Sequence, residues 1–310
     1  MISDLFTTTV LIGILASGIR LSTPYLFAAI GETFGQKSGV LNLGVEGQML
    51  LGAFASFYVA LTTGNLWLGL LTAMFVGALM GLAMAYVTVN LHAEQGISGI
   101  GFYLFGLGMS DLLFQKLMGT VETVKGFPEI YIPGLSDIPG IGKIFFSQNI
   151  LVYLAYLLVP LAWFVLNKTT LGLKIRSVGE NPDAADSLGV NVARIRYFTI
   201  ILGGTLSGVA GASMSIALLN VFQQNMTSGL GFIAVALVYF GAWSPIGVLG
   251  GALLFSFINS LQLWMQVLSI PIPSDIAVMM PYVVTILVLV ATVSKVRAPS
   301  ALSKPFERGD

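Results

Sequence analysis

The chain has 310 residues, of which 56% are hydrophobic and only 9% are charged, and its mean hydropathy is +0.90. Soluble domains carry about 25% charged residues, so this composition excludes a protein that covers its whole surface against water. The formal net charge of zero gives no basis for nucleic-acid binding, and one histidine with no cysteine excludes a multi-histidine or thiolate metal site. We therefore expect an integral membrane protein without a metal site or a nucleic-acid partner.

Apolar blocks follow one another along the chain, and they are long enough for transmembrane helices rather than barrel strands. They cover residues 5–30, 40–63, 66–91, 96–118, 149–166, 195–220, 229–243, 246–267 and 276–293. The sequence therefore predicts an all-α, polytopic transmembrane helical bundle of about nine spans, within a range of eight to ten. Residues 1–295 form a single transmembrane domain in this interpretation, and residues 296–310 form a cytoplasmic tail.

A broken segment is predicted near the amino end of the chain. The first apolar block contains Arg20 and Pro24, and a proline inside a helix removes a hydrogen bond and bends the helix. The glycine-rich residues 31–47 that follow are interpreted as a broken or re-entrant segment rather than a simple turn between spans.

Glu46 lies within apolar sequence, where a charge is expensive and by default suggests function. If this stretch is helical, Asn42 and Glu46 share one face because they are four residues apart. Two interpretations stay open. Either Asn42, Glu46 and Gln48 line a translocation pathway, or Glu46 satisfies the backbone of a broken segment from within the bundle.

Small residues recur at four-residue spacing in two blocks, which favours close helix packing in lipid. The first series is Ala73, Gly77, Gly81 and Ala85, and the second is Gly204, Gly208 and Ala212. Packing alone explains both series, and sliding of these helices during a transport cycle is the alternative.

Residues 167–196 contain five of the fourteen basic residues and lie between two apolar blocks. Within them Asn181 is suited to cap a helix, Pro182 to take its first position, and Asp183 to face the positive end of its dipole. Gly189 is suited to end the helix in a left-handed conformation. The pattern therefore predicts a short helix over residues 182–188 that lies off the membrane.

This short helix has two possible uses. Asp183 and Asp186 are three residues apart and share a face, while Ala184, Ala185 and Leu188 offer a small apolar surface. Such a helix on a basic loop suits docking into a groove of another protein. The alternative is a solvated loop whose basic residues only fix the topology.

A further polar stretch, residues 218–232, combines amides and aromatic rings around two glycines. Amides and aromatic rings together suit a ligand such as a nucleoside, whose base stacks and whose hydroxyls need hydrogen-bond partners. The candidate pathway residues here are Phe222, Gln223, Asn225 and Phe232. An ordinary turn between helices is the competing interpretation.

The distribution of lysine and arginine predicts the orientation in the membrane. If residues 167–196, the tail and the adjacent Lys295 are cytoplasmic, Lys37 is cytoplasmic too, and ten of the fourteen basic residues lie inside. The parity of the spans agrees, because four spans separate residues 167–196 from the tail and five precede them. We therefore expect the amino terminus outside and the carboxyl terminus in the cytoplasm.

Three stretches together resemble a known family. TTLGLKIRSVGENPDAADSLGVNVARIR, residues 169–196, resembles the cytoplasmic loop of ABC importer permeases of the branched-chain amino acid, ribose and nucleoside type. GQKSGVLNLGVEGQMLLGAF, residues 35–54, resembles the early glycine-rich segment of that family. MTSGLGFIAVALVYFGAWSPIGVLGGALLF, residues 226–255, is similar to its nucleoside or simple-sugar branch. The resemblance extends over most of residues 20–290.

The resemblance implies a membrane-spanning permease subunit of an ATP-binding-cassette importer in a bacterial plasma (inner) membrane. The expected cargo is a nucleoside or a related small solute, such as a simple sugar or riboflavin. The implied partners are an ATP-binding subunit, a second, non-identical permease subunit, and an extracytoplasmic substrate-binding protein. This chain contains no GxxxxGK[ST] phosphate loop, so ATP and Mg²⁺ are expected on the partner subunit and no cofactor on this chain.

In this family the cytoplasmic loop contacts the ATP-binding subunit, which assigns coupling to one set of residues. That set is Gly172, Arg176, Gly179, Glu180, Asn181, Pro182, Asp183, Ala184, Ala185, Asp186 and Gly189. The alternative function is an ion- or proton-coupled secondary transporter. Such transporters usually need titratable groups in the membrane, where Glu46 and Asp111 are nearly alone. No constellation with catalytic spacing occurs, so an enzyme is not expected.

Overall fold

The structure is a computed structural model that describes residues 7–268, 279–280, 283, 286–287 and 297–307. These residues form helices joined by turns, with only two isolated β-bridges among them. The helices are α1 (Thr8–Lys37), α2 (Val45–Thr63), α3 (Leu66–Ala85), α4 (Gln95–Leu117), α5 (Ile141–Phe145), α6 (Ile150–Lys168), α7 (Thr170–Glu180), α8 (Pro182–Ser187), α9 (Val192–Ser213), α10 (Leu230–Phe240) and α11 (Pro245–Val267). Two π-helical turns, η2 (Tyr86–Asn90) and η3 (Met214–Leu218), extend α3 and α9.

The prediction of an all-α membrane bundle is confirmed. Seven helices in the described part of the chain are long and apolar enough to cross a membrane, namely α1, α2, α3 with η2, α4, α6, α9 with η3, and α11. The predicted block 229–243 contains the eleven-residue α10, which extends only about 17 Å and is too short to cross the hydrocarbon core as a helix. The predicted block 276–293 lies mostly outside the described residues. A count of about nine is slightly higher than seven but compatible with it.

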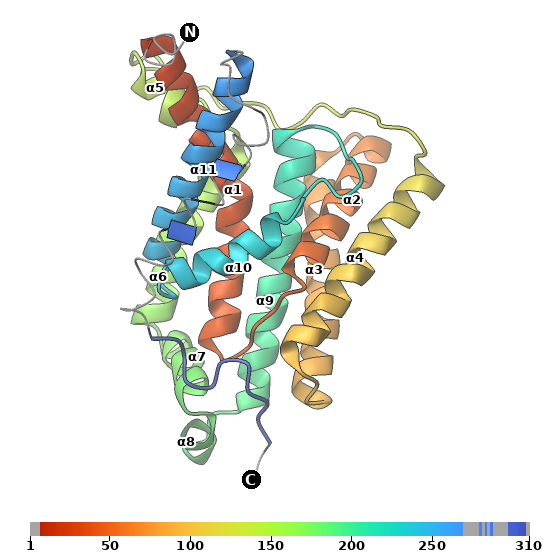
Figure 1. Cartoon of the computed structure of the whole chain (residues 1–310), viewed down its shortest axis with the longest axis vertical. Helices are drawn as coiled ribbons and strands as arrows, with labels where there is room; N and C mark the ends of the chain where they lie inside the picture. Colours follow the sequence, from red (N-terminus) through yellow and green to blue (C-terminus); the bar gives the residue numbers. More distant parts are fainter. Residues whose placement is uncertain (1–6, 269–278, 281–282, 284–285, 288–296, 308–310) are drawn as a thin grey trace.

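The first crossing is longer than predicted, and the chain breaks after it rather than within residues 31–37. α1 continues as a helix to Lys37, and the next helix starts only at Val45. Figure 1 shows the connecting residues 38–44 running from the lower end of α1 back toward the middle of the bundle, where α2 begins. This part of the re-entrant interpretation agrees with the structure. The helical pairing of Asn42 with Glu46 is wrong, because Asn42 precedes the helix.

A second break lies between α9 and α10. After the end of η3, residues 219–229 leave the upper end of the bundle and reach its middle without regular helix. α10 then starts at Leu230 and lies obliquely across the front of the view in Figure 1. The two broken crossings therefore approach the centre from opposite ends, and each starts a helix there.

α9 is the central helix of the bundle and packs against α1, α2 and α3. Its contact with α3 is close, because a Cβ added at Gly204 would lie 2.4 Å from the carbonyl oxygen of Gly77. A Cβ at Gly208 would lie 2.2 Å from the carbonyl oxygen of Ala73. The two predicted series of small residues therefore face each other, and any larger side chain would separate the helices.

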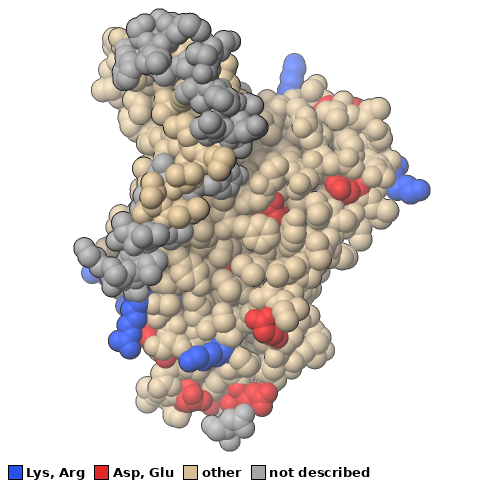
Figure 2. Space-filling model, viewed as in Figure 1, with Lys and Arg blue, Asp and Glu red and all other residues tan. Residues whose placement is uncertain are grey.

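Figure 2 shows charged side chains at the lower end and at the upper right of this face, with mostly uncharged surface between them. The described helices also expose large apolar side chains, among them Phe75 at 67% and Leu71 at 57% on α3. Exposed residues of this kind suit contact with lipid tails, because polar and charged groups are costly there.

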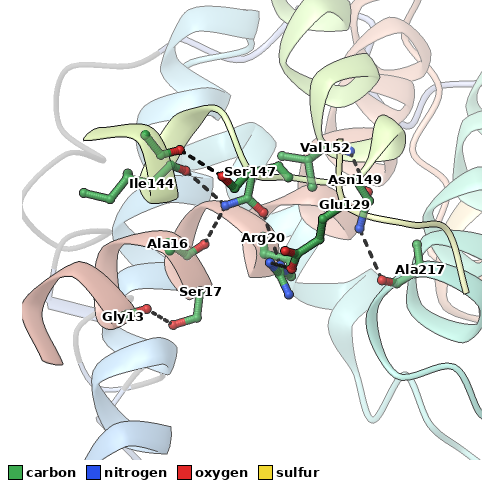
Figure 3. A network of polar contacts seen from close by, with 12 residues as sticks. Gly13, Ala16, Ser17, Arg20, Glu129, Ile144, Ser147, Asn149, Val152 and Ala217 are labelled. Atoms are coloured by element: carbon green, nitrogen blue, oxygen red, sulfur yellow. Dashed lines mark hydrogen bonds and ion pairs between the residues drawn. The ribbon is translucent and has the colours of Figure 1, made fainter. Parts of the chain in front are cut away.

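A polar network fixes the connection between α4 and α6 at the upper end (Figure 3). Arg20 of α1 pairs with Glu129 of this connection at 2.5 Å and donates to Gln148 at 3.2 Å. Asn149 caps α6 by accepting from the N–H of Val152, and it donates to the carbonyl of Ala217 in η3. Arg20 therefore serves to hold the connecting residues 118–149 across the ends of the helices.

Candidate translocation core and coupling surface

Glu46, in the first turn of α2, is the centre of the site where the two broken crossings meet. Its side chain is 1% exposed and accepts three hydrogen bonds from residues more than 180 positions away in the sequence. Thr227 Oγ1 and the N–H of Gly229 donate to Oε1 at 2.6 and 2.7 Å, and the N–H of Gly231 donates to Oε2 at 2.6 Å.

This arrangement places one carboxylate between two helix amino termini. Each amino terminus carries about half a positive charge and unsatisfied N–H groups, which an anion stabilises. Gly231 brings the backbones together, because a Cβ there would lie 2.5 Å from the nitrogen of Glu46. Of the two interpretations of Glu46, satisfaction of a broken backbone segment therefore agrees with the contacts.

A second buried acid, Glu32 on α1, lies in the stretch 31–47, which the sequence pattern predicts only as a break. Its Oε1 accepts from the backbone N–H of Asn42 and from Gln36 Nε2, both at 3.0 Å. Gln36 in turn accepts from the indole N–H of Trp243 at 2.8 Å. The signal for this cluster was present in the sequence, since Glu32 and Gln36 are four residues apart and share a helix face.

The remaining residues of the predicted pathway divide into two groups. Asn42 and Gln48 are buried and bonded to each other, with Asn42 Nδ2 donating to Gln48 Oε1 at 3.2 Å. Phe222 is fully buried, with its ring 5.2 Å from that of Phe54. Three others are exposed, namely Gln223, Asn225 and Phe232.

Phe232 projects from α10 and meets Tyr103 of α4, with ring centroids 5.2 Å apart in an edge-to-face arrangement. Because Phe232 keeps 36% of its surface exposed, this pair presents aromatic surface beside α10 and α4. Aromatic faces accept a planar ligand by stacking. Among the described residues there is no group of three or more acidic or histidine side chains that could hold a metal ion.

At the lower end, the sequence signals for a short helix agree with the structure. Asn181 Oδ1 accepts from the N–H of Ala184 at 3.0 Å, and Pro182 takes the first helical position of α8. Gly189 follows in the left-handed region, with φ of +84°. The helix ends at Ser187, one residue earlier than predicted.

Residues 167–196 are mostly helical rather than a loop, because α7 occupies the chain between α6 and α8. Gly172 and Gly179 are packing positions, since a Cβ at either would lie 2.1 Å from a carbonyl oxygen, of Val165 and of Lys37 respectively. Ala185 is 3% exposed and packs inward, so it does not belong to the predicted apolar surface of α8. Leu188, in contrast, is 85% exposed.

The rest of the predicted coupling set lies around the surface of α7 and α8. Glu180, Asn181, Asp183 and Ala184 are exposed, whereas Arg176, Pro182 and Asp186 are partly buried. A groove of about 550 Å³ runs between this surface and residues 300–307 near the carboxyl end. Glu180, Pro182 and Asp183 line one wall of the groove, and Lys304, Phe306 and Glu307 line the other.

Comparison with known proteins agrees with this architecture. Residues 14–289 match the family described as the branched-chain amino acid transport system permease component. The guanosine ABC transporter permease protein NupQ of Bacillus subtilis is 39% identical over 303 residues, covering 93% of this chain and 94% of that protein. The nucleoside ABC transporter permease protein NupC of Lactococcus lactis is 40% identical over 299 residues, with the same coverage. The putative glucose ABC transporter permease protein TsgC13 of Haloferax volcanii is 40% identical over 262 residues, covering 83% and 79%.

All three of these organisms also have a more distant relative of the same kind, including the glucose ABC transporter permease protein TsgB13 of Haloferax volcanii, 26% identical over 252 residues, covering 76% of this chain and 65% of that protein. NupP of Bacillus subtilis, a guanosine ABC transporter permease protein, is 25% identical over 268 residues, covering 83% of this chain and 76% of that protein. NupB of Lactococcus lactis, a nucleoside ABC transporter permease protein, is 26% identical over 257 residues, covering 76% and 69%. No solved structure matches the chain. The family match covers nearly the whole chain, so this protein belongs to the branched-chain amino acid transport system permease family and is the permease subunit of an ABC importer.

Proposed function

We propose that this permease carries nucleosides across the plasma membrane. The observation that carries the proposal is the similarity, at 39% and 40% identity and over almost the full length, to permeases named for guanosine and for nucleosides. The exposed Phe232 beside Tyr103 agrees with it, because a nucleobase can stack on aromatic rings. Simple sugars are the competing cargo, since the putative glucose permease is equally similar over a shorter length.

Uptake by cells that produce the complete transporter tests the cargo. We expect labelled guanosine or uridine to accumulate, and unlabelled nucleosides but not glucose to compete with it. Phe232→Ala should weaken this uptake, whereas Phe75→Ala, at an exposed aromatic residue of α3, should leave it unchanged. Accumulation of glucose without competition by any nucleoside would contradict the proposal.

We further infer that the transporter pairs this chain with a second, non-identical permease. The presence of a close and a distant relative in both Bacillus subtilis and Lactococcus lactis supports this pairing. Helix α10, which carries the exposed Phe232 and Tyr239, crosses the front of the view in Figure 1, and a partner permease against this helix would enclose a pathway. An extracytoplasmic binding protein would deliver the solute to the end of the bundle that carries residues 118–149.

The ATP-binding subunit is proposed to dock at α8. Leu188 gives this surface an exposed apolar side chain, and Asp183 and Glu180 give it negative charge. Both features suit docking into a partner groove that is lined by basic side chains. Because the ATPase makes different contacts with α8 in its open and closed states, ATP binding would shift the permease between its inward- and outward-facing states.

Cross-linking tests this docking, because the chain has no cysteine of its own. Leu188→Cys should form a thiol cross-link to the ATP-binding subunit in the assembled transporter. Val121→Cys, an exposed position at the opposite end of the bundle, is the matched control and should form none. If Leu188→Cys never captures the ATP-binding subunit, the docking site is wrong.

A further inference from the structure

The segment near the carboxyl end is bound to the bundle, although its sequence suggests only a charged tail. In residues 297–307, Ala301 is 4% exposed, and Leu302 and Phe306 pack against the main hydrophobic core. The N–H of Ala301 donates to the carbonyl of Gly179 at 2.9 Å. The N–H of Ser303 donates to the carbonyl of Gly39 at 3.1 Å.

These two bonds join parts of the chain that belong to different functional regions. Gly179 lies in the last turn of α7, two residues before the cap of α8. Gly39, with φ of +89°, is the second residue of the broken segment 38–44. The segment 297–307 therefore bridges the candidate coupling helix and the start of the first broken crossing.

Arg196 of α9 is the third attachment point. It is 1% exposed, and its Nη1 donates to the carbonyl of Lys304 at 3.1 Å. Its Nε and Nη2 have no hydrogen-bond partner among the described residues. Burial of a guanidinium is costly unless its N–H groups are hydrogen-bonded. Loss of the bond to the Lys304 carbonyl would therefore be expensive. The sequence places Arg196 among the basic residues of 167–196 but does not indicate this contact.

The broken segment leads directly from this attachment to the buried centre. Asn42 donates from its backbone to Glu32, and its side chain accepts from the N–H of Gly44, at 3.0 and 2.9 Å. Glu46 follows two residues later and binds the amino end of α10. A displacement at Gly39 is therefore connected through hydrogen-bonded backbone to the place where the two half-crossings meet.

We propose that residues 297–307 act as a strap that transmits movement of α8 to the broken segment 38–44, with Arg196 as its buried positioning residue. This rests on the proposed docking of the ATP-binding subunit at α8. The strap forms the second wall of the groove beside α8, so it lies next to the helix whose movement it would transmit. Removal of the strap should uncouple ATP hydrolysis from transport while leaving the docking surface of α8 in place.

The test uses the complete transporter in lipid vesicles with three altered forms of this chain. One form ends at Val296, one carries Ala301→Pro, which removes the N–H bonded to Gly179, and one carries Arg196→Gln. Arg297→Ala, at an exposed position that starts the strap, is the matched control. For each form we measure co-purification of the ATP-binding subunit, basal ATP hydrolysis, its stimulation by the loaded binding protein, and uptake.

We expect the ATP-binding subunit to co-purify with each form and basal ATP hydrolysis to persist. Stimulation of hydrolysis by the loaded binding protein, and uptake, should each fall by about tenfold or more, which is the size of a typical coupling between two sites. The control should behave as the wild type. If the shortened chain fails to fold, the results for Ala301→Pro and Arg196→Gln test the proposal instead. Wild-type uptake in these two variants overturns the proposal, and so does loss of the ATP-binding subunit from them alone, because the strap would then serve docking. Failure of the wild type to retain that subunit contradicts the proposed function itself.

Discussion

At the scale of single residues, buried carboxylates decide how this membrane protein can have broken crossings. Backbone N–H groups in the hydrocarbon region must be satisfied within the protein, and non-helical backbone is tolerated there only when it is enclosed. Glu46 supplies acceptors to Thr227, Gly229 and Gly231, and Glu32 supplies one to Asn42. Each acid therefore allows a chain break that a purely apolar bundle could not contain.

Replacement of Glu46 by glutamine is predicted to destabilise the protein and reduce uptake. The amide would turn one acceptor into a donor and leave at least one of the three bonded donors unsatisfied, at about 1–3 kcal/mol for each such group. Thermal unfolding in detergent measures the effect. Glu122→Gln, which changes an exposed carboxylate outside the described helices, is the control and should unfold at the wild-type temperature. Equal unfolding temperatures for the two variants would show that the Glu46 bonds are dispensable.

Glu94 provides a test by pH, because it lies outside the membrane-spanning segments. The N–H groups of Ile97 and Gly96 donate to its carboxylate at the start of α4 and lower its pKa. Because the folded pKa is below the unfolded one, the stabilisation is present above the unfolded value and is lost as pH falls through the folded value.

The unfolding temperature of Glu94→Ala should therefore lie below that of the wild type near neutral pH. This difference in unfolding temperature should disappear as the pH falls below about 4, the usual range of a glutamate pKa. Glu94→Gln keeps an acceptor but does not titrate, so its difference from Glu94→Ala should stay constant with pH. A gap between wild type and Glu94→Ala that persists in acid would contradict the capping role.

At the scale of elements, close helix contacts depend on the positions of glycines, which have no side chain. In lipid there is little hydrophobic drive between helices, so close backbone approach supplies the attraction. α9 approaches α3 through Gly204 and Gly208, and the buried Glu46 region approaches α10 through Gly231. The same residue type is unconstrained elsewhere, since nothing lies within 4 Å of a Cβ added at Gly250.

This contrast gives a matched pair of substitutions. Gly204→Ala would place a methyl group 2.4 Å from the carbonyl oxygen of Gly77, and the forced separation should cost about 1–3 kcal/mol of stability. Gly250→Ala, in the open helix α11, should be neutral or slightly stabilising because alanine favours the helix. Thermal unfolding of both variants measures the difference, and equal effects would show that the α3–α9 contact can relax.

At the scale of the whole molecule, the two ends of the bundle are built differently. The upper end carries the connection 118–149, fixed by Arg20 and Asn149, and the lower end carries α7, α8 and the segment 297–307 (Figure 1). The lysine and arginine distribution predicts that the lower end is cytoplasmic. The proposed partners then follow, with the ATP-binding subunit below and the binding protein above.

Thiol labelling measures this orientation in intact cells. A membrane-impermeant maleimide should label Val121→Cys at once, and Leu188→Cys only after the membrane is permeabilised. Both positions are exposed, at 55% and 85%, so accessibility to solvent does not limit either reaction. The reverse pattern would invert the topology and remove the basis for ATPase docking at α8.

The sequence by itself determined the features that depend on neighbouring residues. Apolar block length predicted the membrane helices, and the Asn181-Pro182-Asp183 pattern with Gly189 predicted α8. The four-residue spacing of small residues predicted a close-packing face on each of α3 and α9, but not that the two faces meet. These are local signals, because capping and helix faces involve residues within about one turn of each other.

Only the tertiary structure decided what the buried charges do. Glu46 meets residues 227–231, and Arg196 meets Lys304, across separations of 181 to 185 and of 108 residues. No local pattern reports which distant backbone a side chain will satisfy, because that depends on how the crossings break and pack. The same reason explains why α10 looked like a full span, and why residues 297–307 looked like a free tail.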